Sequence, residues 1–341
     1  MSILLCLILE GMARLFYSDP YSPYPMLPSD YLPFTTPRNV DFHHHTPEFD
    51  VVYHFDEEGF RSSPAPETGT ADRARLLVMG DSFTLGWGLD YDASFVGRLQ
   101  ARVREYQWLD AAYTAAYSPD AYYAYLVRNA ARLRIQRCVV FVYDGNDLDD
   151  VHDNHWLQVD ERGGPVQLVT RRRYIDYRGY PIPIDGRFDL LQVPVLRDSC
   201  LVRNVYHRMA RPARSTSPSG QDMEPTWQRF EAAVKATSRF CAEQHIRLDY
   251  VVLPAPPVRR KDDWSERHQR MVDVLRRIPA PVLDLGERLS AEAYFPKDGH
   301  LNACGARIVA EAVADSIAPP QERLTLTDQA SHSRLAGIRG E

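Results

Sequence analysis

Three side chains that lie far apart in the 341-residue sequence are of the types that acyl transfer needs. Ser82 ends the tripeptide Gly-Asp-Ser, and a serine hydroxyl is a weak nucleophile unless a neighbouring base accepts its proton. His300 could be that base, because imidazole titrates near neutral pH. Asp298, on the same loop, could accept the other ring N–H and fix the tautomer of the imidazole. The three residues predict a nucleophile, a base and a carboxylate that orients the base.

The same chemistry requires fixed hydrogen-bond donors, because the attacked carbonyl oxygen becomes negatively charged. Asn146, within Asp-Gly-Asn-Asp at 144–147, offers a side-chain amide. The backbone N–H of Ser82 is a second donor if a helix or turn begins there. Removing one such donor typically costs about 100- to 1,000-fold in rate. We therefore expect both groups to contribute to an oxyanion hole.

A sheet must bring these distant residues together. Continuous apolar runs, typical of buried strands, alternate with segments whose apolar residues recur at helical spacing. This alternation predicts five strands in one α/β domain with a mostly parallel sheet, and ligands bind beyond the carboxyl ends of such strands. The clearest strand-like runs are 75–80, 136–147, 247–256 and 280–286, and the clearest helical segments are 93–106, 118–133, 226–245, 263–278 and 303–317.

Together, these clusters resemble the SGNH (GDSL-like) hydrolase family. "GDSFTLGWG" is similar to the nucleophile block of the family, "GND" to its asparagine block and "DGHLNACGARIVAEAV" to its final block. The resemblance covers roughly residues 75–147 and 225–317. It implies a flavodoxin-like three-layer α/β/α sandwich with a mostly parallel five-stranded sheet, activity on acyl esters, and no cofactor. By motif, it implies four roles: nucleophile Ser82, oxyanion donor Asn146, base His300 and orienting carboxylate Asp298.

The sequence departs from the family pattern in three places. The second block normally supplies a glycine N–H to the oxyanion hole, whereas Ala116 best fits that position here. Alanine keeps the N–H but adopts a positive φ less cheaply than glycine. Asp144 stands where the family often has glycine, and the last block reads Asp-x-His rather than Asp-x-x-His. None of these departures removes Ser82, His300 or Asp298.

Three functions fit this pattern. The first is an esterase that removes a small acyl group, such as acetyl, from a carbohydrate or other alcohol through an acyl-enzyme. The second is an O-acyltransferase that uses the same residues to modify a polysaccharide. The third is an inactive carbohydrate-binding or scaffold protein, supported only by the missing block-two glycine. The sequence does not separate hydrolase from transferase, because the same fold hosts both.

Other features of the sequence argue against nucleic-acid and metal ligands. The net charge of −6 gives no electrostatic reason to expect a nucleic-acid partner. The acidic stretch at 144–155 does not fit a calcium loop and is interpreted as a solvated acidic loop or substrate rim. His43–His45 are interpreted as a surface run rather than a ligand set. No metal site is expected, and the scattered cysteines form no C-x-x-C pair: Cys6, Cys138, Cys200, Cys241 and Cys304.

The chain is expected to divide into four parts. Residues 1–17 form a short apolar segment that could be the remnant of a membrane anchor, and residues 18–70 an extended arm. The arm contains "FDEEGFR", which is similar to a segment of membrane-associated family members. The hydrolase domain is expected at 71–318, with an insertion or cap at 148–224, and a disordered tail at 319–341. A membrane-associated or exported protein is favoured, with a cytoplasmic one left open.

Overall fold

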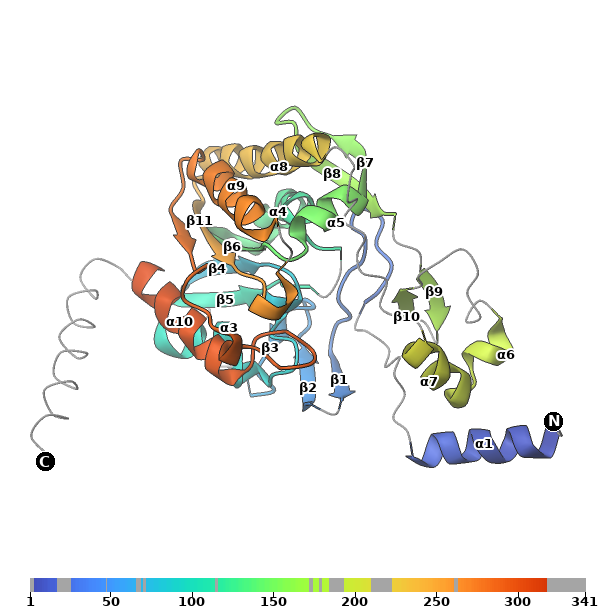
Figure 1. Ribbon diagram of the computed structural model, residues 1–341. Helices are drawn as coiled ribbons and strands as arrows, with labels where there is room; N and C mark the ends of the chain where they lie inside the picture. The colour runs from blue at the N-terminus through green and yellow to red at the C-terminus, as the bar shows by residue number, and fades with distance from the viewer. Residues whose placement is uncertain are drawn as a thin grey trace, which may run out of the picture.

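A sheet with helices on both faces organises the chain (Figure 1). The computed structural model describes residues 3–16, 26–46, 48–65, 69, 72–113, 116–171, 174–177, 180–183, 193–209, 223–260 and 263–317. The predicted tail, 319–341, lies outside the described residues.

Five parallel strands form the central part of the sheet, in the order β5-β4-β6-β11-β12. This order is the flavodoxin-like arrangement, in which the strand order reverses beside the first strand of the parallel set. The predicted fold class, a three-layer α/β/α sandwich with a mostly parallel sheet, is confirmed. The strands are β4 (Ala74–Met79), β5 (Tyr106–Asp110), β6 (Ile135–Tyr143), β11 (Arg247–Leu253) and β12 (Val282–Asp284).

The parallel strands are apolar on both faces because each face has its own helical layer. On β4, Leu77 and Met79 pack in one core while Leu76 and Val78 pack in the other. One layer contains α4 (Pro119–Leu133), α8 (Glu224–Glu243) and α9 (Trp264–Arg276), and the other contains α3 (Phe95–Arg102) and α10 (Ala303–Ile317). The predicted helix start at 118–119 is confirmed, with Pro119 in the first turn of α4.

Three further strands, all from the segment expected as an extended arm, enlarge the sheet to eight. They are β1 (Val40–His45), β2 (Asp50–Phe55) and β3 (Arg61–Ser62), which continue the sheet antiparallel beyond β5. The histidine run lies on β1, where side chains alternate between the two faces. His43 and His45 are therefore exposed, whereas His44 is buried.

The region between β6 and α8 begins with α5 (Asp147–Asp153) and the antiparallel hairpin of β7 (Asn154–Val159) and β8 (Pro165–Thr170). It continues through β9 (Tyr174–Tyr177), β10 (Tyr180–Pro183), α6 (Pro194–Arg197) and α7 (Cys200–Met209). The N-terminal helix α1 (Ile3–Phe16) packs against α7, to one side of the main sheet (Figure 1). No helix in the described part of the chain is long and apolar enough to cross a membrane.

Candidate active site

Ser82 lies where β4 ends and the short helix α2 (Ser82–Leu85) begins. The Asp81 side chain accepts a hydrogen bond from the Phe83 N–H at 2.9 Å and so caps the helix, while Gly86, at φ +74°, ends it. As the first residue of a helix, Ser82 has a backbone N–H without an intrahelical acceptor. Burial raises the pKa of Asp81 to about 8. The local structure therefore presents the hydroxyl of Ser82 beside a free backbone donor.

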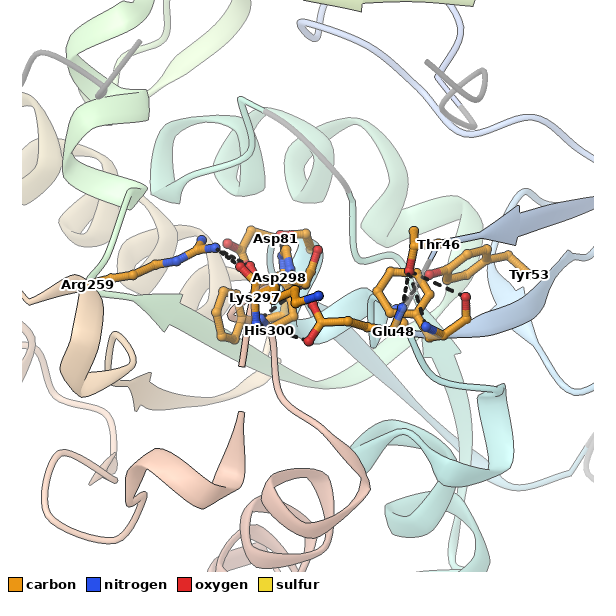
Figure 2. Close-up of polar contacts among 12 residues, drawn as sticks. Thr46, Glu48, Tyr53, Asp81, Arg259, Lys297, Asp298 and His300 are labelled. Carbon is orange, nitrogen blue, oxygen red and sulfur yellow. Dashed lines mark hydrogen bonds and ion pairs between the residues drawn. The ribbon is translucent and has the colours of Figure 1, made fainter. Parts of the chain in front are cut away.

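Three of the predicted residues meet in a chain of hydrogen bonds. Ser82 Oγ lies 2.7 Å from His300 Nε2. His300 Nδ1 lies 2.6 Å from Asp298 Oδ1 (Figure 2). Burial alone would raise the pKa of Asp298, but the hydrogen bond and charge of His300, with a smaller effect of Arg259, lower it below its usual value. Asp298 is therefore ionised at neutral pH, and its carboxylate can orient the ring and stabilise a positive charge on it.

The intervening Gly299 allows Asp298 to reach the His300 ring despite the shorter Asp-x-His spacing. Gly299 has φ +83°, and this turn lets Asp298 Oδ1 accept both the ring Nδ1–H and, at 3.2 Å, the backbone N–H of His300. A Cβ at Gly299 would lie 2.6 Å from Cζ of Arg259. The position therefore requires glycine for both its backbone conformation and its space.

The predicted oxyanion donors beyond Ser82 have distinctive local geometry. Ala116 adopts φ +56°, in the left-handed region that alanine occupies less cheaply than glycine. The carbonyl of Ala116 accepts a hydrogen bond from Asn154 Nδ2 at 3.1 Å, which helps to hold this conformation. Asn146 directs one Nδ2–H to Asp150 Oδ2 at 3.2 Å, which leaves the second hydrogen of the amide for another acceptor.

Asp144, the second departure from the family pattern, anchors the loop that carries Asn146. Its Oδ1 accepts the Ala255 N–H at 2.6 Å, and its Oδ2 lies 2.6 Å from His268 Nδ1 and 2.9 Å from Trp264 Nε1. His268 Nε2 lies 3.1 Å from Asp284 Oδ1. Burial would lower the pKa of His268, but the two carboxylates outweigh it and raise the pKa to about 9. A protonated imidazole therefore links the ends of β6 and β12.

The acidic residues that follow Asn146 are buried in α5, so the interpretation as a solvated loop was wrong, while the alternative of a substrate rim stays a prediction. Asp147 and Asp150 are fully buried in α5. Asp147 accepts the Tyr143 N–H at 3.1 Å, and Asp149 pairs with Arg267 at 3.0 Å. These partners make burial of the carboxylates possible. Among the described residues, no three or more His, Cys, Asp or Glu side chains are grouped to hold a metal ion.

Aromatic rings surround the imidazole of His300. The Phe83 ring lies 4.7 Å from it and stacks on Tyr143 at 3.8 Å, while the Trp87 ring lies 5.9 Å away. His44 packs edge-on against Trp87 at 4.5 Å, and burial lowers the pKa of His44 to about 4. Sequence reasoning missed His44 as a neighbour of the site, as well as Glu48 and Arg259, because all three come from segments without a recognised motif.

The chain is similar in structure to a group of esterases and acylhydrolases. It matches TesA with 14% identity and a TM-score of 0.41 over 70% of this chain and 95% of that one. A psychrotrophic esterase, EstA, from Pseudoalteromonas sp. matches with 9% identity and a TM-score of 0.41 over 74% and 98%. Axe2, an acetylxylan esterase from Geobacillus stearothermophilus, matches with 12% identity and a TM-score of 0.40 over 70% and 92%.

No protein-family model matches the sequence, and neither does any curated protein. With TM-scores below 0.5, the structural similarities carry no weight for activity, which we argue from the geometry of the site.

Proposed function

We propose that this protein is a serine esterase of SGNH type that removes a small acyl group, such as acetyl, from a carbohydrate or another alcohol. The observation that carries this proposal is the hydrogen-bonded chain from Ser82 through His300 to Asp298, with contacts of 2.7 and 2.6 Å. A nucleophile, a base and an orienting carboxylate in this order are the arrangement that activates a serine hydroxyl. The buried rings of Phe83 and Trp87 beside His300 favour a small acyl group.

In the proposed reaction, Ser82 Oγ bonds to the acyl carbon while its proton passes to His300 Nε2. The N–H groups of Ser82 and Ala116 and the Asn146 amide stabilise the negative oxygen of the tetrahedral intermediate. His300 then returns the proton to the departing alcohol as the ester C–O bond breaks, which leaves an acyl-enzyme. Water attacks this intermediate with His300 again as base, and the acid is released with Ser82 restored.

The test is an assay of the full chain on chromogenic acetyl, butyryl and octanoyl esters, beside Ser82→Ala. We expect the acetyl ester to be the best substrate and Ser82→Ala to lose at least about 1,000-fold in kcat. Product that appears on an added sugar acceptor would favour the O-acyltransferase with the same residues. Equal, negligible activity of both proteins on every ester would reject the enzyme and leave the carbohydrate-binding or scaffold function.

We further propose that α1 contacts a membrane surface. Its exposed apolar side chains include Leu4, Leu7 and Leu15, which are 63–80% exposed. Glu10, the only acidic residue of α1, accepts hydrogen bonds from the N–H groups of Cys200 and Leu201 at the start of α7. These bonds and the Ser199 hydroxyl outweigh desolvation and lower the pKa of Glu10 to about 2. The carboxylate is thus used within the protein, and the exposed surface of α1 is apolar except for Arg14, which pairs with Glu10.

Co-sedimentation with phosphatidylcholine–phosphatidylglycerol vesicles tests this proposal. We expect the wild type to sediment with the vesicles and the double variant Leu4→Glu/Leu7→Glu to stay in solution. Val159→Glu, at a half-exposed valine on β7, is the matched control and should sediment like the wild type. Equal sedimentation of all three proteins would reject a role for α1.

A further inference from the structure

The loop that carries Asp298 is held from one side by a carboxylate from the arm. Glu48 Oε1 accepts the backbone N–H of Lys297 at 3.0 Å, and its Oε2 accepts that of Asp298 at 2.6 Å (Figure 2). Hydrogen bonds to a charged acceptor are roughly twice as strong as those between neutral groups. Glu48 therefore fixes two successive peptide groups immediately before the Gly299 turn.

A cation holds the same loop from the other side. The Arg259 guanidinium donates to the carbonyl oxygen of Lys297 at 3.1 Å and to that of Asp298 (Figure 2). Both the N–H and the C=O of Asp298 thus have charged partners from segments far away in sequence. Backbone hydrogen bonds close this turn, from the Phe295 N–H to the His300 carbonyl and from the Gly299 N–H to the Phe295 carbonyl. Within the turn, Glu48 and Arg259 hold the N–H and the C=O of Asp298 and so help to determine where its carboxylate lies.

Glu48 is itself well positioned, at the turn between β1 and β2. Thr46 Oγ1 accepts the N–H groups of Glu48 and Phe49, both at 3.2 Å, and the Thr46 N–H donates to the Phe49 carbonyl at 2.8 Å. The Phe49 ring packs 5.4 Å from that of Phe295, just before the loop. The turn therefore presents the Glu48 carboxylate in a defined orientation.

The same arm also supports the nucleophile. Tyr53 Oη accepts the Gly88 N–H at 2.7 Å. Arg61, fully buried on β3, donates to the carbonyl of Gly86 at 3.0 Å and to those of Leu85 and Leu89. These contacts fix the turn that follows α2. Residues of the arm thus contact both segments that supply the Ser82–His300–Asp298 chain.

We propose that Glu48 is a positioning residue for this site: by gripping the backbone of Lys297 and Asp298, it sets the Asp298 carboxylate against the His300 imidazole. The proposal rests on the proposed function for its kinetic consequence, because it assigns Glu48 a part in activating Ser82. The arm, which lies outside the motifs of the hydrolase domain, would thereby help to position the residues that react.

The test compares Glu48→Ala, Glu48→Gln and a matched control, Glu57→Gln. Glu57 is an exposed residue of the same arm. A displacement of about 1 Å in such a site costs on the order of 100-fold in rate, so we expect kcat on the acetyl ester to fall about 10- to 100-fold in Glu48→Ala. KM should change less than about twofold. Glu48→Gln keeps one acceptor oxygen and should fall between Glu48→Ala and the wild type.

A second readout does not depend on ester turnover. The proton on His300 Nδ1 is observed by ¹⁵N-edited NMR and assigned by its loss in His300→Gln. We expect its signal to shift or broaden in Glu48→Ala, to change less in Glu48→Gln, and to match the wild type in Glu57→Gln. A purely structural role would lower the melting temperature but leave kcat and this signal unchanged in the folded protein.

The two readouts separate the possible failures. If the wild type hydrolyses no ester but the Nδ1 signal responds to Glu48→Ala, the proposed function fails and the positioning role stands. If the wild type is active and Glu48→Ala matches it in kcat and in the Nδ1 signal, the positioning role is overturned. If Glu48→Ala does not fold, Glu48→Gln decides by the same two measurements.

Discussion

The protonated His268 between Asp144 and Asp284 should make the free energy of unfolding decrease as the pH rises into the alkaline range. Its pKa rises from 6.5 to about 9 on folding, and each tenfold change in proton affinity corresponds to about 1.4 kcal/mol. The contribution to the free energy of unfolding is therefore about 3 kcal/mol. Because the folded pKa is raised, this stability is fully present below about pH 6.5 and is lost as the pH rises through about 9.

Urea unfolding of the wild type and His268→Gln from about pH 6 to pH 10 measures this effect. Glutamine can still donate hydrogen bonds through its amide but carries no charge, so it removes the titrating group. We expect the wild type to exceed the variant by the largest margin near pH 6, and this margin to shrink by about 3 kcal/mol by pH 10. Taking the difference cancels the other groups that titrate in this range, including tyrosines and lysines.

A constant difference between the two proteins across this range would refute the reasoning. It would mean that folding leaves the pKa of His268 near its ordinary value of 6.5, so that the ring is neutral over most of this range. The hydrogen bonds to Asp144 would then be those of a neutral imidazole, and the loop that carries Asn146 would lack an ionic anchor. The geometry places Asp144 Oδ2 only 2.6 Å from the ring nitrogen, which is why we expect the charged form.

Three more predictions concern single residues. Ala116→Gly should raise the unfolding free energy by up to about 1 kcal/mol, because alanine is strained at φ +56°; lower stability in denaturant titration would contradict this. Asp298→Asn should lower kcat about 10,000-fold with an unchanged melting temperature, and a loss below tenfold would exclude the orienting role. Asp249→Ala should lower the free energy of unfolding by about 3–5 kcal/mol, because the buried Arg137 guanidinium, 2.8 Å away, loses its carboxylate partner. Thermal unfolding measures this loss.

The parallel part of the fold could be predicted because local pattern and burial agree there. Strands β4 and β6 lie between two helical layers, so their sequences are continuously apolar and easily recognised. Asn302, a residue type that commonly caps helices, precedes α10, and its side chain accepts the N–H groups of Cys304 and Gly305. The sequence signal is local in each of these cases.

The arm and its contacts could not be predicted for the opposite reason. Strand β1 has a polar sequence with one buried histidine, so its alternation carries little hydrophobic signal. Glu48 meets Asp298 across 250 positions of the chain, and no motif connects them. The burial of the acidic residues of α5 was missed because α4 and α8 pack against this helix, and Arg267, the partner of Asp149, lies 118 positions away in the chain.

The long separation in sequence between Ser82 and His300 also delays assembly of the site during synthesis of the chain. The two residues are 218 positions apart, and a ribosome adds about 5 to 20 residues per second. Roughly 10 to 40 seconds therefore pass between synthesis of the serine and synthesis of its base. Strand β4 and its serine are therefore synthesised well before α10 and the loop that precedes it. The growing chain thus carries a serine without a base, and the proposed acyl chemistry begins only when synthesis has delivered His300.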